Sequence, residues 1–174
     1  MRLSISKIKG AVCRWFRHLP YRGAGMIIFR QGNGGDEILL GLRCYDYDRG
    51  YWSIPGGGKK RGESFREATL REVEQELKNE PLVTHLAVVD WGPETLQELP
   101  EIRIRFVPFF LWNTYLLRQN QSLINWPSCH NHELSEMRWF PLQQIPARLH
   151  PLLPLTLRCF RQKLSPKRNV VGKH

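Results

Sequence analysis

The hydrophobic residues of this chain fall into short runs that predict several β-strands before and after one central helix. Runs of strand length that are rich in β-branched and aromatic residues, and that are bounded by Gly, Pro, Asn or Asp, are typical of strands. Strands are expected at residues 24–29, 38–43, 51–54, 82–91, 101–112 and 137–140. Gly and Asn in residues 31–37 predict a hairpin turn between the first two strands, and residues 92–100 are expected to form a turn.

The central helix is expected at residues 64–78, where apolar side chains recur with helical spacing. Ser64 and Glu67 match a capping box at its start, and Pro81 lies just beyond its end. Further helical segments are predicted at residues 141–145 and 151–163. Strands on both sides of a central helix, with a second helix closing the chain, indicate an α/β sandwich in which helices cover a sheet.

One predicted strand has an apolar face and a basic face. Ile102, Ile104 and Phe106 alternate with Arg103 and Arg105. Because successive side chains of a strand point to opposite faces, the two arginines share one face. That face is expected to lie either on a substrate cleft or on water.

The length of 174 residues fits a single domain, and the chain contains no internal repeat or linker. The domain is expected at residues 23–164, after a basic extension at residues 1–22 and before a basic tail at residues 165–174. Apolar residues of the extension recur at roughly helical spacing between Lys and Arg. Such a helix either packs on the domain or on a second copy, which leaves a homodimer open, or lies on an anionic membrane surface.

The charge of the chain is strongly positive, with 26 Lys and Arg against 16 Asp and Glu, a formal net charge of +10. This excess predicts an anionic partner, which is a nucleotide, a nucleic acid such as RNA, or an acidic membrane surface. The four cysteines are scattered without a CxxC pair, which favours reduced thiols and a cytoplasmic location. No apolar run approaches the roughly 20 residues that span a bilayer, which argues against a membrane protein.

The stretch with the clearest chemistry is a glycine-rich turn at residues 54–58, followed by basic residues and the acidic central helix. Glu72 and Glu76 are one helical turn apart and therefore project from the same face. Two carboxylates on one face, below a glycine loop, suit a hard cation such as Mg2+, which prefers oxygen ligands. The alternative is that both are solvated, ion-paired residues of an ordinary amphipathic helix.

The same stretch resembles the box of the Nudix hydrolases. That box runs Gly, five residues, Glu, seven residues, Arg-Glu, an aliphatic residue, any residue, Glu-Glu, any residue, Gly and an aliphatic residue. The residues that match in register are Gly57, Glu63, Arg71, Glu72, Val73 and Glu76. Three positions depart from the pattern, with Gln75 in place of a Glu, Lys78 in place of the Gly and Asn79 in place of the aliphatic residue. The resemblance covers approximately residues 23–152.

The resemblance implies a fold and an activity. The fold is a mixed β-sheet sandwiched between helices, with the box as a loop–helix–loop. The activity is Mg2+-dependent hydrolysis, with Mn2+ as a substitute metal, at the pyrophosphate bond of a nucleoside diphosphate linked to another moiety. Nucleotide sugars, ADP-ribose, dinucleotides and NTPs are the substrates to consider.

The resemblance also implies roles for single residues. The metal ligands would be Gly57, through its carbonyl, Glu72, Gln75, Glu76 and Glu133. Glu72, Glu76 and Glu136 would be catalytic, although Glu136 is equally expected as a structural surface residue. Arg71 would pair with Glu63 and hold the box in shape. The basic residues Arg43, Lys59 and Lys60 are candidates for the substrate phosphates, with surface solubility as the alternative for the lysines.

Gln75 is the departure with the largest chemical consequence. An amide oxygen still ligates a cation, but it carries no charge and accepts no proton. Weaker metal binding and slower turnover are therefore expected, with activity retained because Glu72 and Glu76 are present. The rival hypothesis is a Nudix domain that binds a nucleotide or RNA without cleaving it, which Gln75, Lys78 and the positive charge favour.

Overall fold

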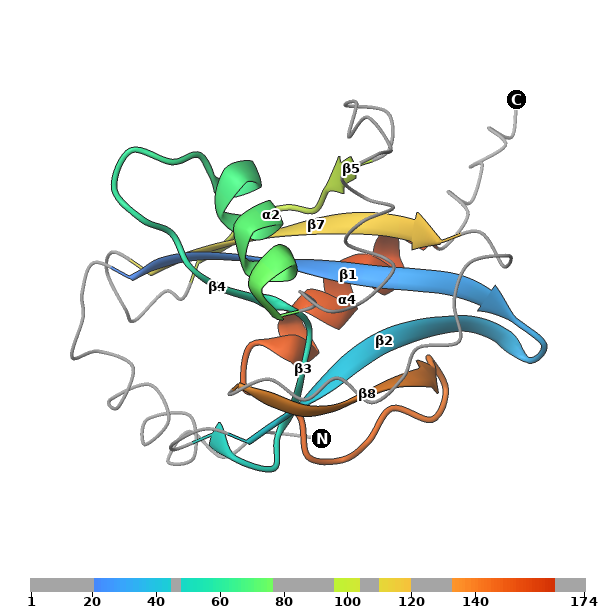
Figure 1. Ribbon diagram of the computed structural model, residues 1–174. Coiled ribbons are helices and arrows are strands. Elements are labelled where there is room, and N and C mark those ends of the chain that lie inside the picture. The colour runs from blue at the N-terminus through green and yellow to red at the C-terminus, as the bar shows by residue number, and fades with distance from the viewer. Residues whose placement is uncertain (1–20, 45–47, 77–95, 104–109, 120–132, 165–174) are drawn as a thin grey trace, which may run out of the picture.

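A computed structural model describes residues 21–44, 48–76, 96–103, 110–119 and 133–164 of the chain. Within them, one mixed β-sheet lies between two helices, as expected from the sequence (Figure 1). The elements in chain order are β1 (Arg22–Gly32), β2 (Gly35–Arg43), β3 (Trp52–Ser53), β4 (Gly56–Gly58), α2 (Phe65–Glu76), β5 (Leu96–Glu98), β6 (Ile102–Arg103), β7 (Leu111–Gln119), β8 (Leu134–Pro141) and α4 (Leu153–Leu164).

Strand β1 is the centre of the sheet, and it brings the glycine-rich turn to the site. It pairs in parallel with β7 along one edge, with Ala24 opposite Asn113. Its other edge is shared by two antiparallel partners, β2 near its C-terminal end and β4 near its N-terminal end. The pairing of Ala24 with Gly57 therefore ties the turn directly to the most buried strand of the domain.

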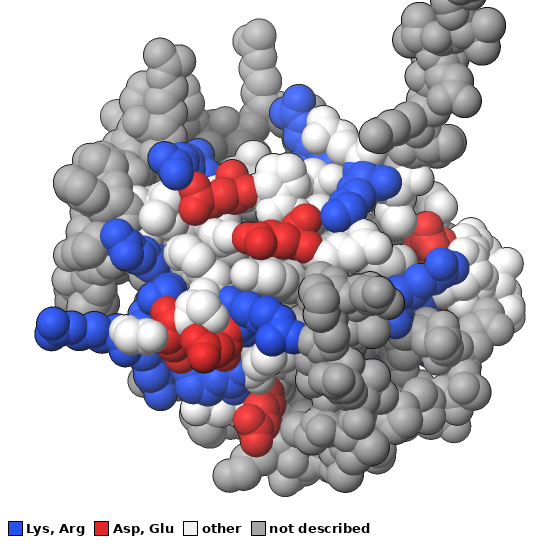
Figure 2. All heavy atoms as spheres, turned by 90° about the horizontal axis from the view of Figure 1, so that it is seen from above, with Lys and Arg blue, Asp and Glu red and all other residues white. Residues whose placement is uncertain are grey.

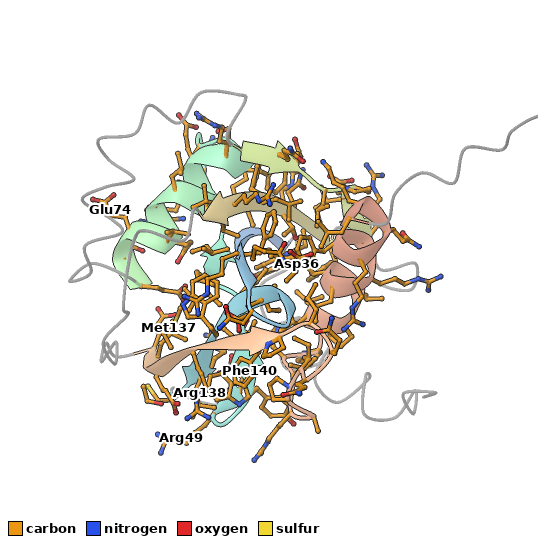
Figure 3. The ribbon with its side chains drawn as sticks, turned by 90° about the vertical axis from the view of Figure 1, so that its right-hand side faces the viewer. Asp36, Arg49, Glu74, Met137, Arg138 and Phe140 are labelled. Atoms are coloured by element: carbon orange, nitrogen blue, oxygen red, sulfur yellow. The ribbon has the colours of Figure 1, made fainter. Side chains whose placement is uncertain are left out.

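Alternation along β1 builds two apolar layers. Met26 and Ile28 pack with Val73 on the α2 side, whereas Ile27 and Phe29 pack with residues of α4 on the other side. Both faces of β1 are buried because a helix covers each face of the sheet, which explains its continuous apolar run. Figure 3 shows α2 and α4 on opposite sides of the sheet.

Several elements differ from the expectation. Strand β5 lies within residues 92–100, which were expected to form a turn; it pairs with the edge of β7, and Leu99 next to it is 2% exposed. The expected helical turn at residues 141–145 is instead a tight turn in which the N–H of Gln144 donates to the carbonyl of Pro141 at 2.8 Å. Strand β5 is set by its pairing with β7, which local periodicity does not report.

Other expectations lie outside the described residues. They are the basic extension, the strand at residues 82–91, the alternation between residues 104 and 106, and the basic tail. In the described part of the chain, no helix combines the length and the hydropathy needed to cross a membrane. Figure 2 shows Lys and Arg interspersed with Asp and Glu among the described residues of the face seen from above.

Candidate active site

The glycine-rich turn packs so closely that a Cβ on either of two residues would lie within 3 Å of a neighbouring atom. A Cβ on Gly56 would lie 2.5 Å from the carbonyl oxygen of Ala24, and Gly56 has a φ of 153°. A Cβ on Gly57 would lie 2.6 Å from the carboxyl carbon of Glu72. The carboxylate of Glu72 therefore lies against the backbone of the turn, in the space that a Cβ on Gly57 would take, whereas at Gly56 the neighbour is backbone and only glycine fits.

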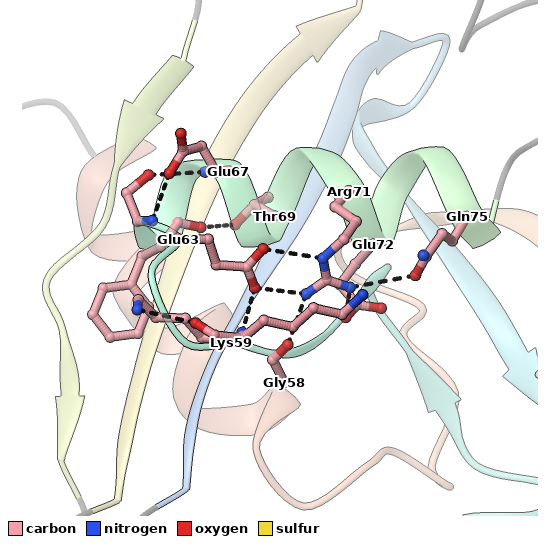
Figure 4. Close-up of polar contacts among 11 residues, drawn as sticks. Gly58, Lys59, Glu63, Glu67, Thr69, Arg71, Glu72 and Gln75 are labelled. Carbon is pink, nitrogen blue, oxygen red and sulfur yellow. Dashed lines mark hydrogen bonds and ion pairs between the residues drawn. The ribbon is translucent and has the colours of Figure 1, made fainter.

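Arg71 joins the loop to the helix through a set of hydrogen bonds (Figure 4). Its Nε and Nη2 donate to the two oxygens of Glu63, at 3.1 and 2.8 Å, and Nη2 also donates to the carbonyl of Gly58 at 2.8 Å. Its Nη1 donates to Glu72 Oε1 at 2.5 Å. The bonds from Arg71 lower the pKa of Glu63 to about 2, so this carboxylate stays charged at neutral pH.

The start of α2 is closed by the predicted capping box. The N–H of Glu67 donates to Ser64 Oγ at 3.1 Å, and the N–H of Ser64 donates to Glu67 Oε2 at 2.6 Å. This reciprocal pair satisfies two backbone donors that the helix leaves open. The capping box is confirmed, and it fixes where the helix begins and thus which carboxylates face the loop.

Glu76 is the most deeply buried carboxylate of the box, with 3% of its surface exposed. Its Oε2 accepts the N–H of Gly56 at 2.9 Å. Burial raises the pKa of Glu76 to about 8; the charge of Arg43 and the bond from Gly56 oppose this rise, while the nearby charges of Glu133 and Glu72 add to it. Three carboxylates are thus close enough to interact.

Arg43 lies among these acids. Its Nη1 is 3.9 Å from Glu76 Oε1 and its Nη2 is 3.7 Å from Glu133 Oε2. Its Nε forms an ion pair with Asp48, a buried residue of the loop after β2. Asp48 could not be singled out from the sequence, because residues 44–50 contain two aspartates and their spacing does not show which one turns inward.

The side chain of Gln75 is exposed, unlike the buried carboxylate of Glu76 on the same helix. Its amide oxygen accepts a hydrogen bond of 3.3 Å from Arg71 Nη1. Glu74, also exposed, points away from the sheet (Figure 3). The contact of Gln75 with the guanidinium of Arg71 follows from their i, i+4 spacing.

Glu136 is not brought together with the box carboxylates. Glu136 is on β8, opposite Leu42 of β2, and it forms an ion pair with Arg138. The guanidinium of Arg138 is 5.8 Å from the ring of Trp52, which packs against the core on the α4 side of the sheet. The structure instead places Glu133 next to Arg43. A catalytic role for Glu136 remains a prediction, and its placement favours a structural one.

Lys59 contacts the start of α2 and Lys60 contacts Glu63 just before it, whereas Arg43 lies near the end of the helix. Lys59 Nζ lies 5.8 Å from the ring centre of Phe65, and the N–H of Lys60 is hydrogen-bonded to Glu63. Lys60 is exposed. A ligand that bound all three predicted basic residues would therefore have to extend along the helix.

The oxygen atoms of the box are suited to a hard cation, although the described side chains do not form a complete set of metal ligands. In the described residues, no three His, Cys, Asp or Glu side chains converge closely enough to hold a metal ion. The groups that do meet are all oxygen donors: the Gly57 backbone against Glu72, and the buried carboxylate of Glu76. Mg2+ takes few protein carboxylates and keeps its remaining positions for water and phosphate, so this set suits it.

The raised pKa of Glu76 predicts a pH dependence of stability. The folded protein holds this proton up to about pH 8, whereas the unfolded chain releases it near pH 4.5. The folded state of the metal-free protein is therefore expected to lose stability as the pH rises from about 5 to about 8. Urea unfolding at several pH values should show this loss, and Glu76→Gln should flatten it. If the free energy of unfolding depends on pH equally in the wild type and in the variant, the buried carboxyl group of Glu76 is not the cause.

The fold and the box together define a Nudix-type domain. The family model described as "NUDIX domain" matches residues 19–160, and the chain belongs to this family.

Relatives of known function are similar over different lengths. The RNA pyrophosphohydrolase of Orientia tsutsugamushi (strain Boryong) is 33% identical over 107 residues, which cover 61% of this chain and 60% of the relative. The chain thus matches about 60% of the length of that relative. The RNA pyrophosphohydrolase of Novosphingobium aromaticivorans is 28% identical over 168 residues, or 90% of this chain and 98% of the relative.

Solved structures share the fold. A C. elegans Ap4A hydrolase in a binary complex superimposes with a TM-score of 0.56 at 21% identity, covering 83% of this chain and 97% of that one. At this level of identity the likeness concerns the fold alone.

Proposed function

We propose that this protein is a divalent-metal-dependent pyrophosphohydrolase, with Mg2+ as its metal and Mn2+ as a substitute. Its substrate would be a nucleoside diphosphate linked to another moiety, and the names of the relatives add RNA to the candidates. The observation that carries the proposal is the buried carboxylate of Glu76, held against the glycine turn beside Glu72. The scattered cysteines, which form no CxxC pair, support a cytoplasmic location for this reaction.

The residues of the site would divide the work. The Gly57 carbonyl, Glu72 and Glu76 would hold the metal, which neutralises phosphate charge and acidifies a bound water. Arg71 fixes Glu72 through Oε1, which leaves Oε2 to face the metal or to accept a proton from the attacking water. The N–H of Gly56 fixes Glu76 in the same way. Arg43 would contribute a positive charge to the phosphates.

The test is a substrate panel. Purified protein would be incubated with nucleotide sugars, ADP-ribose, dinucleotides, NTPs and 5′-triphosphorylated RNA in Mg2+ or Mn2+. We expect a nucleoside monophosphate or a shortened 5′ end from at least one of them, and loss of turnover with EDTA. No turnover on any member contradicts the proposal.

A second candidate is a domain that binds a nucleotide or RNA without cleavage. The exposed amide of Gln75, bonded to Arg71 instead of joining the buried carboxylate of Glu76, favours it. In that case the wild type would bind RNA with a steep salt dependence and hydrolyse nothing.

Gln75→Glu separates the two candidates. A carboxylate at this position adds negative charge beside Glu72, so we expect turnover in Mg2+ to rise roughly tenfold. Gln143→Glu, which adds the same charge in an exposed turn, is the matched control and should leave turnover unchanged. Salt-sensitive RNA binding with no catalysis, even in Gln75→Glu, supports the binding domain.

A further inference from the structure

Asp48 is held against the side chain of Arg43 by the loop that follows β2. The N–H of Gly50 donates to the carbonyl of Arg43 at 2.7 Å, and the N–H of Arg43 donates to the carbonyl of Tyr51 at 2.9 Å. The N–H of Tyr51 in turn donates to the carbonyl of Asp48 at 3.1 Å. These bonds close the loop on itself and turn Asp48 inward, where its side chain is 9% exposed.

The position of Asp48 decides which edge of the guanidinium remains for other groups. Its carboxylate pairs with Nε of Arg43, so the edge formed by Nη1 and Nη2 is turned toward the box. There the two nitrogens lie 3.9 Å from Glu76 and 3.7 Å from Glu133. Both distances are longer than a hydrogen bond. The carboxylates of Glu76 and Glu133 therefore attract this edge of the guanidinium, while its N–H groups can still donate to a ligand.

We propose that Asp48 is a positioning residue that presents the Nη1–Nη2 edge of Arg43 to phosphate oxygens of the substrate beside Glu76. The proposal rests on the proposed function, in that it takes the box as a site for phosphates. Guanidinium binds phosphate through two parallel bonds in a fixed plane. A fork held in place before binding loses less side-chain freedom when the ligand arrives.

The charges of the cluster set a condition on such binding. One guanidinium faces three carboxylates, those of Asp48, Glu76 and Glu133. A phosphate would meet net negative charge unless a cation joins the site, so binding through Arg43 should require Mg2+.

The test uses inorganic pyrophosphate as the probe, titrated calorimetrically with and without Mg2+. We expect Asp48→Asn and Arg43→Gln each to weaken binding about tenfold, the size of one charge-assisted hydrogen bond. The double variant should bind no more weakly than Arg43→Gln, because Asp48 acts through Arg43. Asp36→Asn, which removes a carboxylate at the other end of β2, is the matched control.

A second readout reports the arginine itself. The Nε–H resonance of Arg43, assigned by its loss in Arg43→Lys, should be protected from exchange in the wild type and lose protection in Asp48→Asn. Should that variant fail to fold in a thermal melt, Asp48→Glu keeps the charge but shifts the fork, and we expect several-fold weaker binding. Wild-type affinity in whichever variant folds overturns the proposal.

The outcomes distinguish this proposal from the proposed function. Independent, additive losses in the double variant, or a wild type that does not bind pyrophosphate, overturn the role of Asp48. If the coupled losses are observed but no substrate is hydrolysed, the hydrolase assignment fails while the positioning role stands.

Discussion

Replacement of Glu76 by Gln is expected to lower turnover at least about 100-fold. This loss is larger than the usual effect of replacing a residue that only hydrogen-bonds to a metal ligand. The amide retains an oxygen for the N–H of Gly56, so the loop should keep its place. What it lacks is the negative charge that Glu76 carries once it has released its proton, and this charge is what holds a cation. Initial rates on the best substrate of the panel, in saturating Mg2+, measure the loss.

The matched control lies on the same helix. Glu74→Gln makes the same change at an exposed position that points away from the sheet, and it should leave turnover within about twofold of the wild type. If Glu76→Gln also retains wild-type turnover, the carboxylate has no part in the reaction.

The second large effect is a loss of stability. Alanine substitutions at the three consecutive glycines 56–58 distinguish this loss from a loss of catalysis. Gly56→Ala is expected to lower the free energy of unfolding by about 3 kcal/mol or more. Its Cβ would lie 2.5 Å from backbone atoms of Ala24 and Gly25 in the central strand, which have no freedom to move away. Urea denaturation of the variant measures the loss.

The neighbouring glycines predict different outcomes. A Cβ on Gly57 meets the end of the Glu72 side chain, which turns away at little cost. Gly57→Ala should therefore fold normally and lose activity about tenfold or more, because a ligand is displaced. A Cβ on Gly58 meets nothing within 4 Å, so Gly58→Ala is the control for both. Equal destabilisation by all three variants would show that the turn is generally intolerant of alanine.

The sequence predicted the parts of the fold that local patterns determine. The strands β1 and β2 carry uninterrupted apolar runs because both sheet faces are covered, and the capping box sets the start of α2. It ended a strand at residue 112, where β7 in fact continues to Gln119, and it did not predict β5, which is three residues long and exists because the edge of β7 pairs with it. A strand of that length has too few positions to show a period.

In the candidate site, too, the sequence predicted the residues that lie on one helix but not those that are placed by strand pairing or by a loop. Fixed spacing on one helix identified Glu72 and Glu76, since residues one turn apart share a face. It left Glu133 and Glu136 equivalent, because the register shift between Leu42 and Arg43 that separates them depends on how β2 pairs with β8. Asp48 was missed for the related reason that its position depends on how its loop closes.

The most direct test of the central claim needs no knowledge of the substrate. Titration of Mn2+ into the protein, followed by electron paramagnetic resonance of the free ion, measures whether the box is a metal centre. We predict that the wild type binds Mn2+, that Mg2+ competes, and that Glu76→Gln weakens binding at least tenfold while Glu74→Gln does not. Mn2+ binding that is equally strong in Glu76→Gln would contradict the assignment of the box as the metal site.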